Sequence, residues 1–167
     1  ASPAFAAWKE FKYDDLGVVK EFPTDPKVET GTYKTPVAGM ATAHIFSVDE
    51  PDVKYKMTVV DLMDKAAEGA SIMGECTFMA EDEGMPVANM TARVEPGAKA
   101  VYGRIQTTDL KDGSRSMTAC FFTKGRLYKI QATVLPSNPD FPNSSEAIRF
   151  INSLSFNLQG EGGGGGG

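Results

Sequence analysis

Residues 115–135 read RSMTACFFTKGRLYKIQATVL, and this stretch decides the fold. It contains two runs typical of β-strands, 115–123 and 126–135, joined only by Lys124-Gly125. Such a short connection with a glycine predicts an antiparallel hairpin. Within 117–122 both alternating sets of side chains are apolar, which predicts a central strand covered on both faces.

Turn residues divide the surrounding sequence into further strands. Before the hairpin, the strands predicted at 87–94 and 100–108 complete a four-strand meander. The earlier part of the chain predicts four more strands, at 16–22, 28–35, 40–48 and 53–59. The last of these alternates strictly between apolar and polar residues, as a strand with one buried face does.

Two segments change to the period of a helix. From Asp61 onward an apolar stripe is predicted to face the sheet, comprising Leu62, Ala66, Gly69, Ala70, Met73, Cys76 and Ala80. Near the C-terminus, Asn143 to Glu146 resembles a helix cap, followed by a stripe of Ala147, Phe150, Ile151 and Leu154. One sheet with helices on both faces buries every stripe, so the sequence predicts an α+β fold, an αβα sandwich around a mostly antiparallel sheet.

The two ends lie outside this pattern. Ala4-Phe5-Ala6 has the small residues that a signal peptidase requires, so residues 1–7 are interpreted as the remnant of a signal peptide or a disordered N-terminus. Residues 160–167 are glycine apart from Glu161 and are expected to form a flexible tail. The prediction is a single domain over 8–159 in a periplasmic or secreted protein.

Composition excludes several classes of function. The 167 residues include 17 Lys and Arg against 22 Asp and Glu, for a net charge of −5. A duplex-binding module would need the opposite balance, so no nucleic-acid partner is expected. No apolar run reaches the roughly 18 residues of a membrane helix.

Catalytic chemistry finds little support in the residues. His44, the only histidine, lies in the middle of a predicted strand, away from any nucleophile turn. There is no glycine-rich phosphate loop, and two cysteines 44 residues apart with one histidine do not match a zinc site. We therefore expect a protein that is not an enzyme and carries no cofactor.

Cys76 and Cys120 leave two alternatives open. In an exported protein they can form a disulfide, if the helix lies on the strand that bears Cys120. They can also remain two buried thiols that act as small apolar residues. The second alternative is slightly favoured, because each position already serves packing.

Methionine is enriched around Cys76. Met73, Cys76 and Met79 occupy successive helical turns, and their soft sulfur atoms suit Cu(I). The simpler interpretation is that these side chains fill the core. The trio therefore gives a weak candidate metal site.

Spaced aromatic and turn residues carry a family resemblance. They are Trp8 and Phe11, Phe22-Pro23, Asp112-Gly113 with Arg115, the run GRLYKI at 125–130 and the run AIRFINSLSF at 147–156. With these the chain resembles small, mostly uncharacterised exported bacterial proteins that share the fold of PsbP, an extrinsic subunit of photosystem. The resemblance implies an αβα sandwich and a binding or assembly role rather than catalysis. It carries over no functional residue.

The leading functional hypothesis is a non-enzymatic exported domain that binds a protein or an envelope component through a sheet edge and loops. Trp8 and Tyr13 are the predicted contact residues. The alternative is a carrier of a small ligand or of copper, with an apolar pocket beside the methionine-containing helix.

Overall fold

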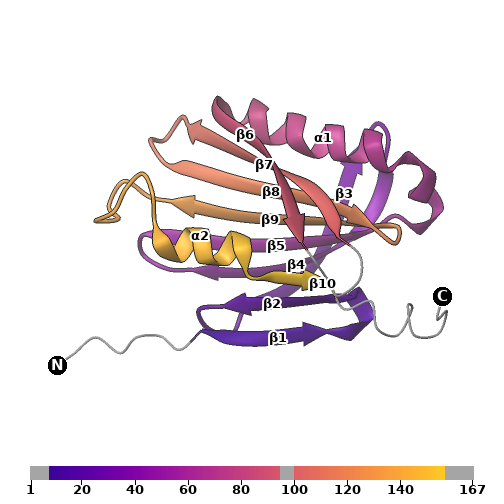
Figure 1. Cartoon of the computed structure of the whole chain (residues 1–167), viewed down its shortest axis with the longest axis horizontal. Coiled ribbons are helices and arrows are strands. Elements are labelled where there is room, and N and C mark those ends of the chain that lie inside the picture. Colours follow the sequence, from indigo (N-terminus) through magenta and orange to yellow (C-terminus); the bar gives the residue numbers. More distant parts are fainter. Residues whose placement is uncertain (1–7, 95–99, 157–167) are drawn as a thin grey trace.

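Seven antiparallel strands form the main sheet of the computed structural model, which describes residues 8–94 and 100–156 (Figure 1). Their spatial order is β3-β4-β5-β9-β8-β7-β6. The predicted four-strand meander is confirmed as β6 to β9, and β9 joins it to the earlier strands by pairing with β5. The strands are β3 (Lys27–Thr35), β4 (Gly39–Asp49), β5 (Val53–Asp61), β6 (Gly84–Val94), β7 (Val101–Leu110), β8 (Arg115–Thr123) and β9 (Arg126–Val134).

A second, three-stranded sheet has the order β1-β2-β10. It consists of β1 (Lys9–Tyr13), β2 (Val18–Phe22) and β10 (Leu154–Phe156), and the 3₁₀ turn Asp14–Leu16 connects its first two strands. The sequence predicts β2 but not β1. Three of the five residues of β1 are charged and it forms an edge, so its alternation is too short to be recognised.

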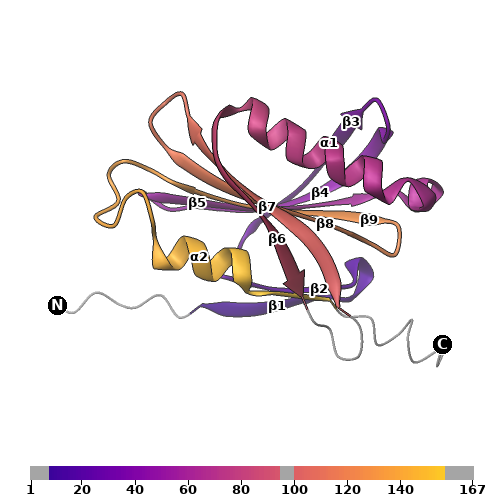
Figure 2. The same cartoon turned by 45° about the horizontal axis from the view of Figure 1, so that its top comes forward.

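The layers confirm the predicted αβα sandwich, with one addition. Helix α1 (Gly69–Asp82) covers one face of the main sheet, and α2 (Ser145–Asn152) lies with the small sheet on the other face (Figure 2). Helix α1 packs on β7 and β8, while α2 packs mainly on β9. Among the described residues, neither helix has the length and hydropathy needed to cross a bilayer.

Strand β8 is the covered central strand that its sequence predicts. Ala119 and Phe121 face the core on the α2 side, together with Tyr55, Tyr128 and Phe150. Cys120 points to the opposite face and joins a second core beneath α1, made of Tyr33, Ala38, Ala43, Val60, Leu62, Ile72, Cys76, Cys120 and Leu127. Both faces of β8 are therefore apolar because each one closes a separate core.

Helix α1 begins later than predicted. A 3₁₀ segment, Met63–Glu68, comes first, and Lys65 within it departs from helical geometry. The buried stripe of the helix is Ile72, Cys76 and Ala80, whereas Ala66 and Ala70 of the predicted stripe are exposed. The irregular turn rotates the helix relative to the pattern predicted from Asp61, which brings Ile72 inward.

Helix α2 forms as its cap predicts. The Ser144 hydroxyl oxygen accepts a hydrogen bond from the backbone N–H of Ala147 at 3.3 Å. Ala147, Phe150 and Ile151 are buried, and Leu154 continues the same apolar stripe from β10. The helix and β10 thereby cover the α2 side of the main sheet as one unit.

Candidate functional site

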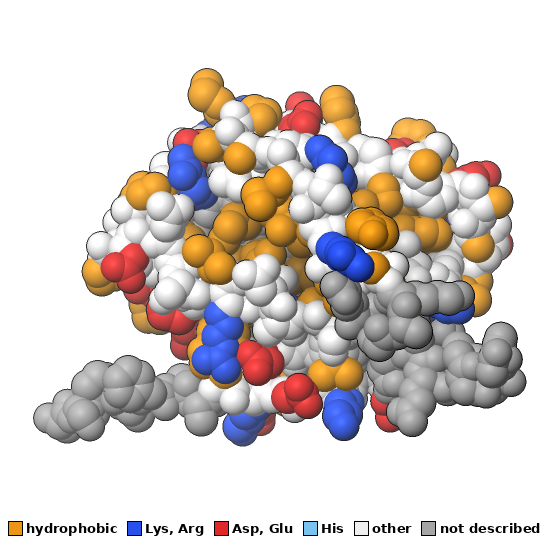
Figure 3. Space-filling view, viewed as in Figure 1, with side chains coloured by type: hydrophobic (Ala, Val, Ile, Leu, Met, Phe, Trp, Pro, Cys, Tyr) orange, Lys and Arg blue, Asp and Glu red, His pale blue; other side chains and the backbone are white. Residues whose placement is uncertain are grey.

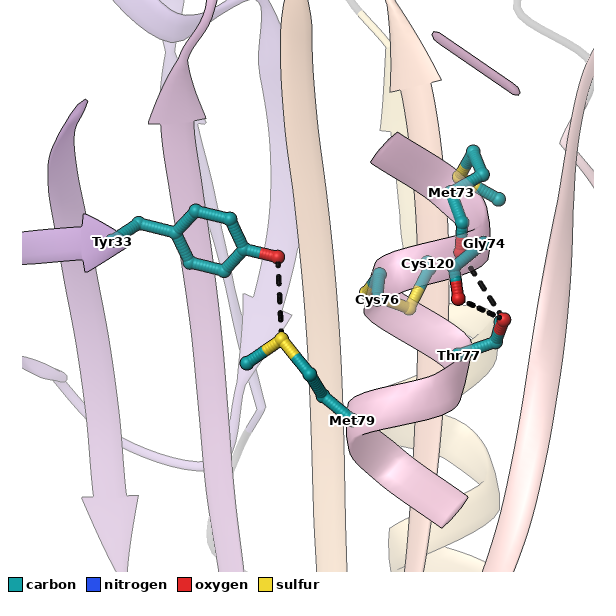
Figure 4. Close-up of a disulfide and its surroundings, with 7 residues drawn as sticks. All are labelled: Tyr33, Met73, Gly74, Cys76, Thr77, Met79 and Cys120. Atoms are coloured by element: carbon teal, nitrogen blue, oxygen red, sulfur yellow. Dashed lines mark hydrogen bonds between the residues drawn. A yellow bond between two sulfur atoms is a disulfide. The ribbon is translucent and has the colours of Figure 1, made fainter. Parts of the chain in front are cut away.

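Cys76 on α1 and Cys120 on β8 form a disulfide, with their Cα atoms 6.4 Å apart (Figure 4). Both residues are fully buried. The slight preference for two free thiols is therefore wrong. A disulfide and close packing do not exclude each other here. Helix α1 lies directly on β8, and the bonded sulfur atoms fill the apolar space that two thiols would fill.

The three sulfur residues singled out as a metal site do not meet as ligands. Cys76 offers no thiolate, because its sulfur is bonded to Cys120. Met79 points toward Tyr33, whose hydroxyl lies 3.9 Å from the Met79 sulfur, while Met73 lies on the other side of the helix (Figure 4). Within residues 8–94 and 100–156, no cluster of three His, Cys, Asp or Glu side chains could hold a metal ion.

The space expected to hold a small ligand is filled. Between α1 and the sheet lie Ile72, Leu127 and the disulfide, all fully buried. Two hollows among the described residues lie on the opposite side of the sheet. One is lined by Glu10, Val19, Glu21, Arg149, Asn152, Ser153, Leu154 and Ser155, and the other by Lys12, Tyr13, Asp14, Asp15, Leu16 and His44. Neither forms the apolar pocket beside α1 that a carrier would need.

His44 belongs to a charged cluster on the α2 side of the sheet. Its Nε2 lies 3.1 Å from an Asp61 carboxylate oxygen, and the other oxygen of Asp61 accepts a hydrogen bond from Arg126 at 3.0 Å. Burial opposes ionisation of Asp61, but the hydrogen bonds and charges of Arg126 and His44 outweigh it and lower its pKa. The cluster fastens β4 to β5 and β9, since each strand contributes one member.

A histidine hydrogen-bonded to a carboxylate can act as a base only if a group to be activated lies within reach. The hollow beside His44 contains one hydroxyl side chain, that of Tyr13. Burial, aided by the charge of Asp25, raises the Tyr13 pKa to about 12, so this phenol stays protonated and is a poor nucleophile. The arrangement holds the strands together and lacks the components of hydrolytic chemistry.

Trp8 and Tyr13, predicted as contact residues, are partly buried instead. Trp8 packs edge-on against Tyr55, with the ring centroids 5.7 Å apart, and Tyr13 packs against Phe46 at 4.4 Å. The two rings attach the small sheet to the main core. An aromatic residue early in the chain looks exposed in the sequence because its distant partners cannot be seen there.

Among the described residues, the longest run of exposed positions lies along β6, and it includes three large apolar side chains. Met85, Val87 and Met90 are 71%, 47% and 57% exposed, and every residue from Met85 to Thr91 is classed as exposed. Because β6 ends the sheet, its outer backbone edge also lacks a partner strand among the described residues. We call β6, together with Tyr102, Arg104 and Ile105 of β7, the β6 surface.

The apolar side of the β6 surface lies on the face of the molecule that includes α2. Hydrophobic side chains gather in its upper middle, above α2, with Lys and Arg beside them and acidic side chains mainly toward the margin (Figures 1 and 3). Helix α1 packs on the far side of the sheet, mainly on β7 and β8 and less on β6, and α2 packs on β9, β8 and β5, so neither helix covers β6 on the α2 side. Large exposed apolar patches on soluble proteins commonly mark interaction sites.

Comparison with known proteins places the fold. No protein-family model and no curated protein matches the sequence. Among solved structures, the chain is similar to the solution structure of cyanobacterial PsbP (CyanoP) from Synechocystis sp. PCC 6803, with a TM-score of 0.55 over 93% of this chain and 96% of that chain. The chain has a PsbP-like fold. The sequence identity is 10%, so the likeness establishes the architecture alone.

Within this PsbP-like fold, the β6 surface is the feature that sequence reasoning missed. The sequence predicts a strand at 87–94 but not its position at the edge of the sheet. A signal was present, because apolar Ala88, Met90, Ala92 and Val94 alternate with polar Asn89, Thr91 and Arg93. That pattern predicts a strand with one apolar and one polar face. It does not show that the strand has a partner strand on one side only.

Proposed function

We propose that this chain is a non-enzymatic, exported accessory domain that binds a protein or envelope component through the β6 surface. One observation carries the proposal: an edge strand with seven consecutive exposed residues, three of them large and apolar. An open edge presents unpaired backbone N–H and C=O groups that a partner strand can complete. Folded proteins normally protect such an edge, so its exposure here favours a binding role.

Two further observations support the accessory and exported parts of the proposal. The single histidine pairs with Asp61, which also accepts a hydrogen bond from Arg126, and it lies beside a protonated phenol, so no group for it to activate is in reach among the described residues. The Cys76–Cys120 disulfide is the kind of bond that persists in oxidising compartments. A PsbP-like fold is compatible with both.

Site-specific photocrosslinking in the native host tests the proposal. A photoreactive residue replaces Met90 on the β6 surface, and a matched variant carries it at Lys124 in the exposed turn between β8 and β9. We expect a discrete adduct from position 90 that is absent from position 124. Identical adducts from both positions, or none from position 90, would contradict binding through β6. A native mass spectrum showing a retained small molecule would instead favour the carrier function.

A further inference from the structure

The two faces of β6 differ in chemistry. On one face, Met90 lies opposite Ile105 of β7, and Ala92 lies opposite Gly103. On the other face, Asn89, Thr91 and Arg93 lie opposite Gln106, Arg104 and Tyr102. A strand that paired with the open edge would place its side chains alternately beside these two faces.

The polar face is ordered and basic. Arg104 donates hydrogen bonds to the Thr91 hydroxyl at 3.2 Å and to the Asn89 side-chain oxygen, and Asn89 in turn donates to Gln106. The guanidinium of Arg93 lies 5.7 Å from the centre of the Tyr102 ring. The hydrogen-bond partners of Arg104 within the described part of the chain are neutral, so these contacts orient its charge without neutralising it.

The opposite face is apolar and reaches inward from the edge. Met90 is 57% exposed, and Ile105 on the neighbouring strand and Met117 on the next are partly buried against the core. A side chain placed beside Met90 would extend this apolar row by one strand. Burial of one aliphatic side chain there contributes more than one exposed charge pair on the other face.

Building on the proposed function, we infer that β6 receives an extended segment in which acidic and apolar residues alternate. The acidic side chains would lie beside Arg93 and Arg104, the apolar ones beside Met90, and backbone hydrogen bonds would join the segment to the sheet. The charge of the whole chain is −5, whereas Arg104 brings to this edge a positive charge whose hydrogen-bond partners, Thr91 and Asn89, are neutral.

A second copy of the chain fits this edge less well. Antiparallel pairing of two β6 strands would keep the polar faces on the same side of the enlarged sheet. Arg104 of both copies would then lie on one face, where like charges oppose association. The same charges attract an acidic segment, which is why we favour that occupant.

Fluorescence anisotropy with three labelled nine-residue peptides tests the inference. The peptides alternate valine with glutamate, threonine or lysine, and a fourth is the glutamate peptide with alternate amides N-methylated. We expect the glutamate peptide to bind about threefold more tightly than the threonine peptide, as one exposed charge pair with Arg104 allows. We expect the lysine peptide to bind more weakly still, and N-methylation to abolish binding.

Charge reversal supplies the matched variants. The double variant Arg93→Glu, Arg104→Glu should prefer the lysine peptide, whereas Lys124→Glu on a distant turn should bind as the wild type does. Because these side chains are exposed, the thermal unfolding midpoint should change little, and Arg104→Gln serves if the double variant unfolds.

The outcomes separate this inference from the proposed function. Three results would overturn the inference that the partner segment is acidic. They are equal binding of the three peptides, an unaltered preference in the double variant, and a dimer in sedimentation that forms through β6. A specific crosslink from position 90 without binding of any peptide would likewise overturn it while the proposed function stood. Failure of both the crosslink and the peptides would overturn the two together.

Discussion

The side-chain nitrogen of Lys20 lies 3.6 Å from the centre of the Phe150 ring, inside the core between β2 and α2. It donates hydrogen bonds to the Phe150 carbonyl and to the Ser153 hydroxyl oxygen at 2.6 Å, near the C-terminal end of the helix. Lys20 is fully buried, so it joins the small sheet to α2 where water cannot reach.

The buried lysine predicts a rise in stability with pH. Burial lowers the Lys20 pKa to about 6, and the charge of Glu21 opposes this only in part. Between pH 6 and about 10 the unfolded chain binds a proton that the folded chain lacks, so the free energy of unfolding increases with pH. Urea unfolding at pH 7, 8 and 9 should show the rise in the wild type and a flatter profile in Lys20→Met.

Two controls accompany this measurement. Lys12→Met removes an exposed lysine from the neighbouring strand and should keep the slope of the wild type. An NMR titration of the Lys20 side-chain methylene groups reports its pKa directly, even if Lys20→Met folds poorly. Parallel slopes in the wild type and Lys20→Met, or an NMR pKa near 10, would contradict the prediction.

The disulfide predicts a large loss of stability on removal. In the chain-entropy treatment, closing a loop of about 45 residues stabilises the fold by about 4 kcal/mol. Cys76→Ala, Cys120→Ala should therefore unfold at a much lower denaturant concentration than the oxidised wild type. Thiol titration of the unfolded wild type should detect no free thiol before reduction. Two reactive thiols in that sample would mean that the bond is absent.

The sequence was informative where neighbours along the chain are also neighbours in space. The hairpin at 115–135 and the cap at Ser144 both depend on residues only a few positions apart, and both form as predicted. The edge position of β6 depends instead on β9 pairing with β5, across more than sixty residues. No local pattern encodes that pairing, so the candidate site could not be located from the sequence.

Lys20 shows a second limit. Val18, Lys20 and Phe22 alternate on one face of β2, and all three are buried. This alternation is that of a strand whose lysine faces the core. Charged residues are seldom buried, so the sequence alone does not predict a buried lysine here. The carbonyl and hydroxyl groups that make the burial tolerable come from 130 residues further along the chain.

Asp61 predicts a loss of stability in acid. Its pKa is lowered in the folded state, so its contribution is present above the pKa of the unfolded carboxyl group and is lost as the pH falls through the folded value. The side chain is 41% exposed, so the contribution is about 1 kcal/mol. Asp61→Asn should be less stable than the wild type at pH 7, with the two converging near pH 3.

Unfolding by urea at pH 7, 5 and 3 measures this difference. Glu68→Gln, at an exposed position in the 3₁₀ segment before α1, serves as the control and should follow the wild type at every pH. A constant difference between Asp61→Asn and the wild type across the pH range would show that the carboxylate charge is not responsible.

The two glycines of α1 predict opposite responses to alanine. Alanine favours a helix over glycine by about 1 kcal/mol. A Cβ at Gly74 would meet no atom within 4 Å, so Gly74→Ala should raise the free energy of unfolding by about that amount. A Cβ at Gly69 would lie 2.8 Å from the Phe122 ring, closer than carbon atoms normally approach. Gly69→Ala should therefore lower the free energy of unfolding, because the Phe122 ring or the helix must shift to make room for the Cβ. Thermal unfolding of both variants with the disulfide intact measures the contrast, and equal stabilisation by the two would mean that α1 does not approach β8 so closely.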